Sequence, residues 1–213
     1  MRKKQDFIEF MIEAGVLTFG DFTAKSGRKT PYFVNTGNYK TGKHISILGD
    51  YYADLVMESG EQFDALFGPA YKGITLAAAT ASSLYRNYKA DVPYFFNRKE
   101  AKDHGEGGLI IGYKPIDKDR IIIIEDVVTA GTAVRESLKL LKTIADVTVN
   151  TLYVSVDRME RGTGNLSTLD ELKDEFNINV YPIVTARDII KSFPQDDERA
   201  EKMEEYLKIY GAE

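Results

Sequence analysis

Residues 120–133 read Arg-Ile-Ile-Ile-Ile-Glu-Asp-Val-Val-Thr-Ala-Gly-Thr-Ala, and this stretch decides the fold class. The four isoleucines at 121–124 are β-branched and uniformly apolar, which is typical of a strand in a parallel sheet that is covered on both faces. Glu125 and Asp126 follow at the carboxyl end of that strand, where ligands of open α/β sheets bind. The stretch therefore predicts an α/β fold with a mostly parallel central sheet flanked by helices, and a ligand site directly after the strand.

Small residues follow the acidic pair and predict a loop that binds an anion. They are Thr129, Ala130, Gly131, Thr132 and Ala133. Their N–H groups and hydroxyls can surround a phosphate, and Val134, Leu138 and Leu141 recur at the spacing of a helix whose positive end would face it. The two carboxylates would repel a phosphate, so they need hydroxyl groups or a metal as partners. A phosphorylated sugar therefore suits the site better than free phosphate, although a buried strand followed by a polar turn and a capped helix shares part of the pattern.

The composition indicates a globular protein and gives no sign of a general nucleic-acid binder. Of the 213 residues, 43% are apolar and 29% are charged, and the formal net charge is −5. This length suffices for one well-packed α/β domain. We expect a single domain over residues 1–213, in which residues 1–40 or so form an N-terminal hood on an α/β core.

The chain has no cysteine, which excludes disulfides and thiolate metal sites. The basic start is not followed by an apolar run of signal-peptide length, and no stretch has the apolar length of a membrane span. We therefore expect a soluble, cytoplasmic protein.

A second strand–loop–helix unit is predicted between residues 63 and 85. Residues 63–67 predict a short buried strand, residues 68–73 read Gly-Pro-Ala-Tyr-Lys-Gly, and an alanine-rich helix is expected to follow. The loop is again an anion site by geometry, and Lys72 is the charge that would face the ligand. Because Gly-Pro turns commonly join strands to helices, a plain connection remains an alternative for this loop by itself.

A charged stretch at residues 97–108 contains no apolar residue larger than alanine, so we expect a mobile loop. Arg98, Lys99, Lys102 and His104 concentrate positive charge here in an otherwise acidic protein. A solvated hairpin tip would have a similar composition. A loop that closes over an oligophosphate would need these cations, because it brings positive charge to a leaving group and excludes water.

Two further segments could recognise a flat, negatively charged acceptor. Residues 25–34 read Lys-Ser-Gly-Arg-Lys-Thr-Pro-Tyr-Phe-Val, and a strand that begins at Pro31 would present Phe33 for stacking on a heterocycle. An ordinary charged hairpin is an equal alternative for this segment alone. Arg158 follows a long apolar strand at 147–156, so it should lie on the ligand side of the sheet, where a guanidinium can bind a carboxylate with two hydrogen bonds.

The remaining pattern predicts structural elements only. Helices are expected over residues 3–14 and 43–58 and at the C-terminus, and a late strand is expected at 180–184. Thr168 and Glu171 suggest a capping box. Residues 109–113 and 120–124 flank a polar turn, which predicts that they pair as a hairpin.

Taken in order, these motifs resemble those of the type I phosphoribosyltransferases. Residues 120–133 resemble the family's phosphoribosyl-pyrophosphate motif, in which the acidic pair contacts the ribose hydroxyls and the loop holds the 5′-phosphate. The segments at 25–34, 98–105 and 157–162 are similar to those of orotate phosphoribosyltransferases in particular. The resemblance covers residues 20–165, and the chain departs from many members in having Glu125 where they have aspartate.

The resemblance implies a set of site residues. The catalytic residues would be Lys102, His104, Lys99 and Arg98. The residues that bind phosphoribosyl pyrophosphate would be Lys25, Tyr71, Lys72, Glu125, Asp126, Val127, Val128, Thr129, Ala130, Gly131, Thr132 and Ala133. The residues that bind orotate would be Phe33, Val34, Thr129 and Arg158. A cis peptide bond is expected before Tyr71.

The resemblance further implies transfer of the phosphoribosyl group to orotate, with orotidine 5′-monophosphate and pyrophosphate as products. Mg²⁺ would bind mainly through the substrate, near Glu125 and Asp126, without direct protein ligands. A homodimer is expected in which the loop at 98–108 completes the neighbouring subunit's site. The alternatives are a purine-salvage phosphoribosyltransferase and a non-catalytic sensor of phosphoribosyl pyrophosphate with the same fold.

Overall fold

The computed structural model describes residues 2–24, 27–102, 108–162 and 164–212, and in residues 101 and 102 it describes the backbone alone. The central sheet has six strands in the order β5-β4-β3-β6-β7-β8, and all neighbours are parallel except β4 and β5. The strands are β3 (Ala65–Gly68), β4 (Tyr94–Lys102), β5 (Gly108–Gly112), β6 (Arg120–Ile124), β7 (Thr148–Asp157) and β8 (Asn179–Thr185). The mostly parallel sheet predicted from the sequence is therefore confirmed.

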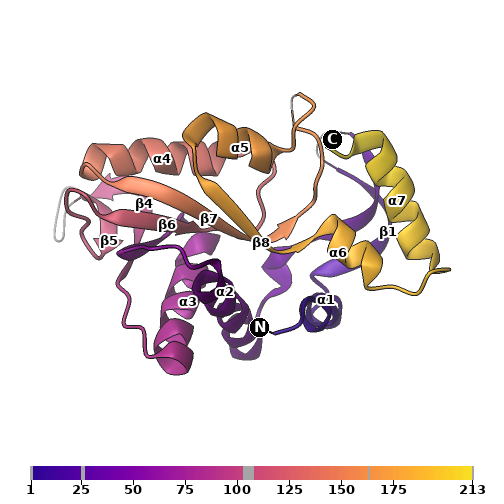
Figure 1. The fold of residues 1–213 in the computed structure, drawn as a ribbon, viewed down its shortest axis with the longest axis horizontal. Helices are drawn as coiled ribbons and strands as arrows, with labels where there is room; N and C mark the ends of the chain where they lie inside the picture. The colour runs from indigo at the N-terminus through magenta and orange to yellow at the C-terminus, as the bar shows by residue number, and fades with distance from the viewer. Residues whose placement is uncertain (1, 25–26, 103–107, 163, 213) are drawn as a thin grey trace.

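Helices cover both faces of this sheet (Figure 1). They are α1 (Lys4–Glu13), α2 (Gly42–Ser59), α3 (Lys72–Tyr88), α4 (Thr132–Ile144), α5 (Thr168–Phe176), α6 (Ala186–Lys191) and α7 (Glu198–Tyr210). Ile121 and Ile123 pack in the core formed with α4 and α5, while Ile122 and Ile124 pack in the core formed with α2 and α3. All four isoleucines are 0% exposed, because a strand with helices on both faces buries alternate side chains in opposite directions.

The N-terminal hood contains a second, two-stranded antiparallel sheet of β1 (Leu17–Thr23) and β2 (Lys29–Val34). The C-terminal helices pack beside it, with α7 against β2 and α6 against α1 (Figure 1). The ring of Tyr206 on α7 lies edge-on to that of Tyr32 on β2, with 6.2 Å between the ring centroids. The hood is therefore built from both ends of the chain, which the sequence pattern did not indicate.

The predicted hairpin between residues 109–113 and 120–124 is wrong. β5 pairs antiparallel with β4, whereas β6 lies between β3 and β7 in the sheet. The physical reason is burial, because β6 is apolar on both faces and needs a central position. β5 is largely exposed or half-exposed and forms the edge of the sheet.

The predicted mobile loop at 97–108 is also corrected in part. β4 continues through the charged residues to Lys102, and Asn97 pairs with Ile110 on β5. Backbone pairing to β5 supplies the hydrogen bonds that the strand needs, so it requires no apolar side chains here. Residues 103–107, which include His104, lie outside the described residues.

The start of α5 differs by one residue from the prediction. The N-cap of α5 is Ser167, whose side chain accepts a hydrogen bond from the N–H of Asp170, so the cap lies one residue before the predicted Thr168.

Among the described residues, no helix combines the length and the apolar character needed to cross a membrane.

Candidate active site

A cavity of about 330 Å³ opens where the strand–loop–helix units of β3 and β6 lie side by side. Its walls are residues 69–72, which follow β3, and residues 125–134, which follow β6. Both loops leave the carboxyl ends of neighbouring parallel strands, as expected for a ligand site in this class of sheet. The sequence therefore located the cavity correctly.

The loop after β3 packs so closely on the start of α3 that only glycine fits at two positions. A Cβ atom on Gly68 would lie 2.0 Å from the carbonyl oxygen of Gly73, and one on Gly73 would lie 2.7 Å from Cδ of Pro69. The peptide bond between Ala70 and Tyr71 is cis, which confirms the expectation from the resemblance. Tyr71 is 72% exposed and lies at the rim of the cavity.

The backbone of the acidic pair is held from behind by hydroxyl groups. The hydroxyl of Tyr52 on α2 donates a 2.6 Å hydrogen bond to the carbonyl of Glu125. Ser155 on β7 donates to the carbonyl of Asp126 from its hydroxyl at 2.7 Å and from its N–H at 2.8 Å. These contacts leave both carboxyl side chains at the cavity, whose lining they form.

Lys72 and Thr36 converge on Asp126. The Nζ atom of Lys72 donates to Oδ2 of Asp126 at 2.7 Å and to Oγ1 of Thr36 at 2.7 Å, and the Thr36 hydroxyl donates to the same Asp126 oxygen. Thr36 belongs to a short 3-10 helix, Thr36–Asn38, that follows β2. This contact joins the hood to the cavity.

The two carboxyl groups differ in acidity. Burial, and then the neighbouring charge of Asp126, raises the pKa of the Glu125 carboxyl, which is 8% exposed. Burial also opposes ionisation of Asp126, but the hydrogen bonds from Lys72 and Thr36 outweigh it and hold the pKa of Asp126 below its ordinary value. Asp126 is therefore the anionic member of the pair, and Glu125 keeps a proton to higher pH than an ordinary glutamate.

Both helices that begin at the cavity lack a side-chain cap. The N-cap residue of α4 is Gly131, with φ +72° and no side chain, and that of α3 is Tyr71, whose side chain accepts no hydrogen bond from the helix. Of the helices that begin elsewhere, α2, α5, α6 and α7 are each capped by a threonine, serine or aspartate side chain, whereas α1 also lacks a side-chain cap. Free N–H groups at a helix start are suited to binding an anion, so the two loops are suited to phosphate groups.

Arg158 follows β7 and lies against the hood. Its guanidinium carbon is 4.4 Å from the centre of the Tyr32 ring, and its Nε donates to Oε1 of Glu160 at 2.8 Å. Its Nη2 also donates to Glu160 and approaches the Thr30 hydroxyl at 3.5 Å. Phe33, on the opposite face of β2 from Tyr32, is 43% exposed and packs against Phe22.

The structure brings together some of the expected site residues and leaves others aside. Tyr71, Lys72 and residues 125–133 all line the cavity. Lys99 lies nearby, with its Nζ 5.9 Å from the centre of the Tyr71 ring, and Arg98 precedes it on β4. Phe33, Val34 and Arg158 belong to the hood and to the end of β7 and do not line this cavity. Lys25 and His104 lie outside the described residues, as does the Lys102 side chain.

Four polar residues that support the site were missed in the sequence. They are Thr36, Tyr52, Ser155 and Glu160. The position of Glu160 two residues after Arg158 was the one usable signal, because a carboxylate so close along the chain can reach the guanidinium. In the sequence, Tyr52 has the pattern of a core residue of a helix and Thr36 that of a loop residue, so neither gave a signal.

The described residues contain no group of three or more His, Cys, Asp or Glu side chains that could hold a metal ion. The available donors at the cavity are the carboxyl oxygens of Glu125 and Asp126. This donor set fits Mg²⁺, which binds through one or two carboxylates together with substrate phosphates and water. It does not fit a metal held by protein ligands alone.

Comparisons with known proteins agree with this geometry. The model of the phosphoribosyl transferase domain family matches residues 35–180. The orotate phosphoribosyltransferase of Clostridium beijerinckii is 48% identical, covering 98% of both chains, and that of Escherichia coli O45:K1 is 46% identical, covering 94% of this chain and 92% of that protein. A crystal structure of the Francisella tularensis orotate phosphoribosyltransferase superposes with a TM-score of 0.89 at 38% identity, over 97% of this chain and 100% of the other. The chain therefore belongs to the orotate phosphoribosyltransferases, within the type I phosphoribosyltransferase family.

Proposed function

We propose that this protein transfers the 5-phosphoribosyl group from phosphoribosyl pyrophosphate to orotate, giving orotidine 5′-monophosphate and pyrophosphate. The observation that carries the proposal is the cavity itself, in which an acidic pair lies between two helix starts without side-chain caps. Relatives named as orotate phosphoribosyltransferases along nearly the whole chain support the choice of acceptor.

The donor would lie across the two loops. Residues 129–133 and the N–H groups at the start of α4 bind the 5′-phosphate, and residues 71 and 72 bind the pyrophosphate. The ribose hydroxyls then meet Glu125 and Asp126. In this arrangement N–H donors and the Lys72 charge meet the anionic phosphates, and the two carboxyl groups meet the neutral ribose hydroxyls.

Lys72 would change partners when the donor binds. Its side chain is 58% exposed, so it can leave Asp126 for a pyrophosphate oxygen, while Asp126 is 13% exposed and stays in place. Asp126 then accepts a hydrogen bond from a ribose hydroxyl. The exchange costs little because one charge-assisted hydrogen bond replaces another.

The acceptor would bind between the hood and the end of β7. Arg158 binds the orotate carboxylate with two hydrogen bonds, Phe33 lies against the ring, and backbone groups near Val34 and Thr129 contact its edge. Thr36 follows this part of the hood in the chain and contacts Asp126, which places the end of β2 beside the donor cavity.

Catalysis would consist of positioning the two substrates and neutralising the leaving group. The bond between the anomeric carbon and the pyrophosphate oxygen breaks, its electron pair leaves with pyrophosphate, and a ring nitrogen of the orotate anion forms the new bond. Lys72, Lys99 and Lys102, with Arg98, share the charge of the pyrophosphate. His104 supplies a proton or a hydrogen bond to it. Mg²⁺, when bound through the donor, supplies further positive charge at the phosphate oxygens.

We also propose a cytoplasmic protein of one phosphoribosyltransferase domain that acts as a homodimer. β4 and β5 pair antiparallel at the edge of the sheet, and this position of the charged residues of β4 supports the proposal that they reach a neighbouring subunit. The loop between these strands then contributes to the site of the partner.

The test is the loss of orotate absorbance when protein, phosphoribosyl pyrophosphate and Mg²⁺ are mixed. We expect turnover with the metal and none with a chelator in its place. Turnover of hypoxanthine but not of orotate would contradict the choice of acceptor. Binding of the donor without turnover of any nucleobase would instead indicate a sensor.

A further inference from the structure

The pair formed by Arg158 and Glu160 has a defined geometry. A single oxygen, Oε1 of Glu160, accepts from Nε and from Nη2 of the guanidinium. These two nitrogens form the side edge of the arginine fork. The Tyr32 ring lies under the guanidinium plane at 4.4 Å, so the plane and its rotation are both restrained.

At the other edge of the fork, the one hydrogen bond within the described residues is the long contact of 3.5 Å from Nη2 to the Thr30 hydroxyl. A guanidinium has five N–H donors, and a carboxylate is bound best by two parallel ones. Within the described parts of the chain, Glu160 is the only carboxylate paired with Arg158. Because Glu160 occupies the side edge, an acceptor carboxylate would bind the end edge formed by Nη1 and Nη2, where it would replace the long contact to the Thr30 hydroxyl.

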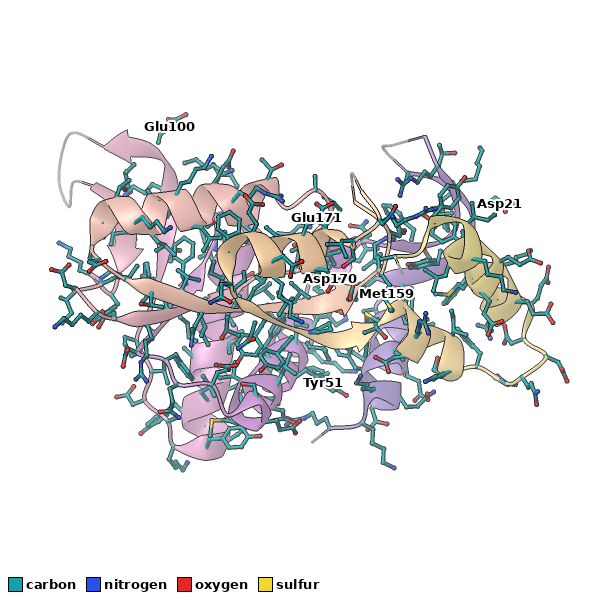
Figure 2. All side chains as sticks on the ribbon, turned by 45° about the horizontal axis from the view of Figure 1, so that its top comes forward. Asp21, Tyr51, Glu100, Met159, Asp170 and Glu171 are labelled. Carbon is teal, nitrogen blue, oxygen red and sulfur yellow. The ribbon has the colours of Figure 1, made fainter. Side chains whose placement is uncertain are left out.

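The C-terminus holds Glu160 in place. Its backbone forms an isolated antiparallel bridge with Gly211, the N–H of Arg161 donates to the carbonyl of Tyr210 at 2.9 Å, and Ala212 donates to Met159 at 2.8 Å. Figure 2 shows Met159 between α5 and the C-terminal helices. The segment that carries Glu160 is thus paired with the very end of the described chain.

An ion pair that only stabilised the fold would give a different result on mutation from one that orients Arg158. The side chains of Arg158 and Glu160 are 15% and 20% exposed, and partly exposed pairs of this kind contribute little to folding by themselves. Loss of a structural pair would lower the folded fraction and affect both substrates alike. Loss of an orienting pair would affect only the substrate that Arg158 binds.

We infer that Glu160 is a positioning and specificity residue for the acceptor: it holds the side edge of the Arg158 guanidinium, with the C-terminal segment as its support, so that the end edge faces the acceptor carboxylate. The inference rests on the proposed function, in which Arg158 binds orotate. It assigns to the C-terminal segment an influence on acceptor recognition although that segment contributes no side chain to the cavity.

The experiment compares steady-state kinetics of the unmodified protein with those of Glu160→Ala, Glu160→Gln, Arg158→Ala and the double variant Arg158→Ala/Glu160→Ala. We expect Glu160→Ala to raise the KM for orotate about tenfold and to change the KM for phosphoribosyl pyrophosphate less than about twofold, because only the acceptor contact is misaligned. Glu160→Gln keeps an oxygen acceptor for Nε and should restore a KM closer to that of the unmodified protein. In the Arg158→Ala background, the loss of Glu160 should add almost nothing, since the group that it orients is gone.

Glu198→Ala is the matched control, because it removes a carboxylate from an ion pair of 2.7 Å with Lys202 on the exposed face of α7. It should leave both KM values unchanged. An unchanged or lower KM for orotate in Glu160→Ala, or an equal rise in both KM values, would overturn the inference. Failure of the proposed function has a separate signature, namely no consumption of orotate by the unmodified protein or no effect of Arg158→Ala on the KM for orotate.

Discussion

The Nζ atom of Lys72 lies 2.7 Å from Oδ2 of Asp126, and this ion pair joins the two loops of the cavity. The lysine comes from the start of α3 and the carboxylate from the end of β6, 54 positions apart in the chain. The pair holds positive charge at the position where the proposed donor places its pyrophosphate. It also keeps Asp126 ionised, as the lowered pKa of Asp126 indicates.

Removal of the Lys72 charge should weaken donor binding selectively. We expect Lys72→Met to raise the KM for phosphoribosyl pyrophosphate about tenfold or more, since a hydrogen bond to a charged group contributes about 1.5–3 kcal/mol. The KM for orotate should change little. Lys202→Met is the control, because Lys202 is similarly exposed and also forms a 2.7 Å ion pair, but on α7. Equal effects of the two substitutions would contradict the role of Lys72.

Replacement of Glu125 by glutamine should stabilise the protein increasingly as the pH rises. Burial, then the charge of Asp126, raises the folded-state pKa of Glu125 above its ordinary value of 4.5. The folded protein therefore holds the Glu125 proton more tightly than the unfolded chain does. The stability that this proton contributes is fully present below the pKa of Glu125 in the unfolded chain, and it is lost as the pH rises through the pKa in the folded protein. Glutamine does not titrate, so the Glu125→Gln variant does not lose this stability as the pH rises. The Tm of the variant minus that of the unmodified protein should therefore increase with pH.

The control for this pH dependence is Glu198→Gln. Its hydrogen bond from Lys202 lowers the pKa of Glu198, so the stability that it contributes is present above the unfolded pKa and lost as the pH falls. The Tm difference between Glu198→Gln and the unmodified protein should not rise with pH. Thermal unfolding curves at a series of pH values measure both differences, and a flat profile for Glu125→Gln would show that Glu125 is not a raised-pKa group.

A methyl group at Gly68 should disturb the donor loop. The added Cβ would lie 2.0 Å from the Gly73 carbonyl oxygen, so β3 and the start of α3 must separate. We expect Gly68→Ala to lower the free energy of unfolding by about 1–3 kcal/mol, the usual cost of overpacking, and to raise the KM for the donor. Gly42→Ala is the matched control, because nothing lies within 4 Å of its added Cβ, and urea unfolding should show little change. A neutral Gly68→Ala would mean that the close packing is dispensable.

The charged hairpin can be tested through Lys102, whose backbone ends β4. We expect Lys102→Ala to reduce kcat much more than it changes the KM for orotate, because the proposed role of the lysine is to neutralise the leaving group. If the hairpin completes the partner's site, mixing Lys102→Ala with Arg158→Ala should recover activity, since one site of each mixed dimer contains both intact residues. No recovery would indicate that each subunit uses its own hairpin.

Local patterns in the chain were sufficient to predict the mostly parallel character of the sheet and the two loops that line the cavity. The run at 121–124 can be buried only between two layers of helices, and both of its faces are indeed packed. Gly68 and Gly131 mark the turns where backbone must approach closely or adopt a left-handed conformation. These features depend on residues that are neighbours in the sequence, so their pattern is visible there.

The strand pairing at the edge was not predictable in the same way. The short polar turn before β6 suggested a hairpin, but burial of both faces of β6 outweighed proximity and placed it between β3 and β7. β5 was left to pair with β4, and that pairing made residues 97–102 a strand despite their charges.

The sequence by itself determined the fold class, the position of the cavity, and the acidic pair and small-residue loop that line it, because each depends on the order of residues within one strand–loop–helix unit. Only the tertiary structure decided how these units are joined. Thr36 contacts Asp126 from the hood, Tyr52 supports Glu125 from α2, and Gly211 pairs with Glu160 from the other end of the chain. Such contacts depend on how distant elements pack, and no local pattern of residues specifies which of many polar side chains will meet.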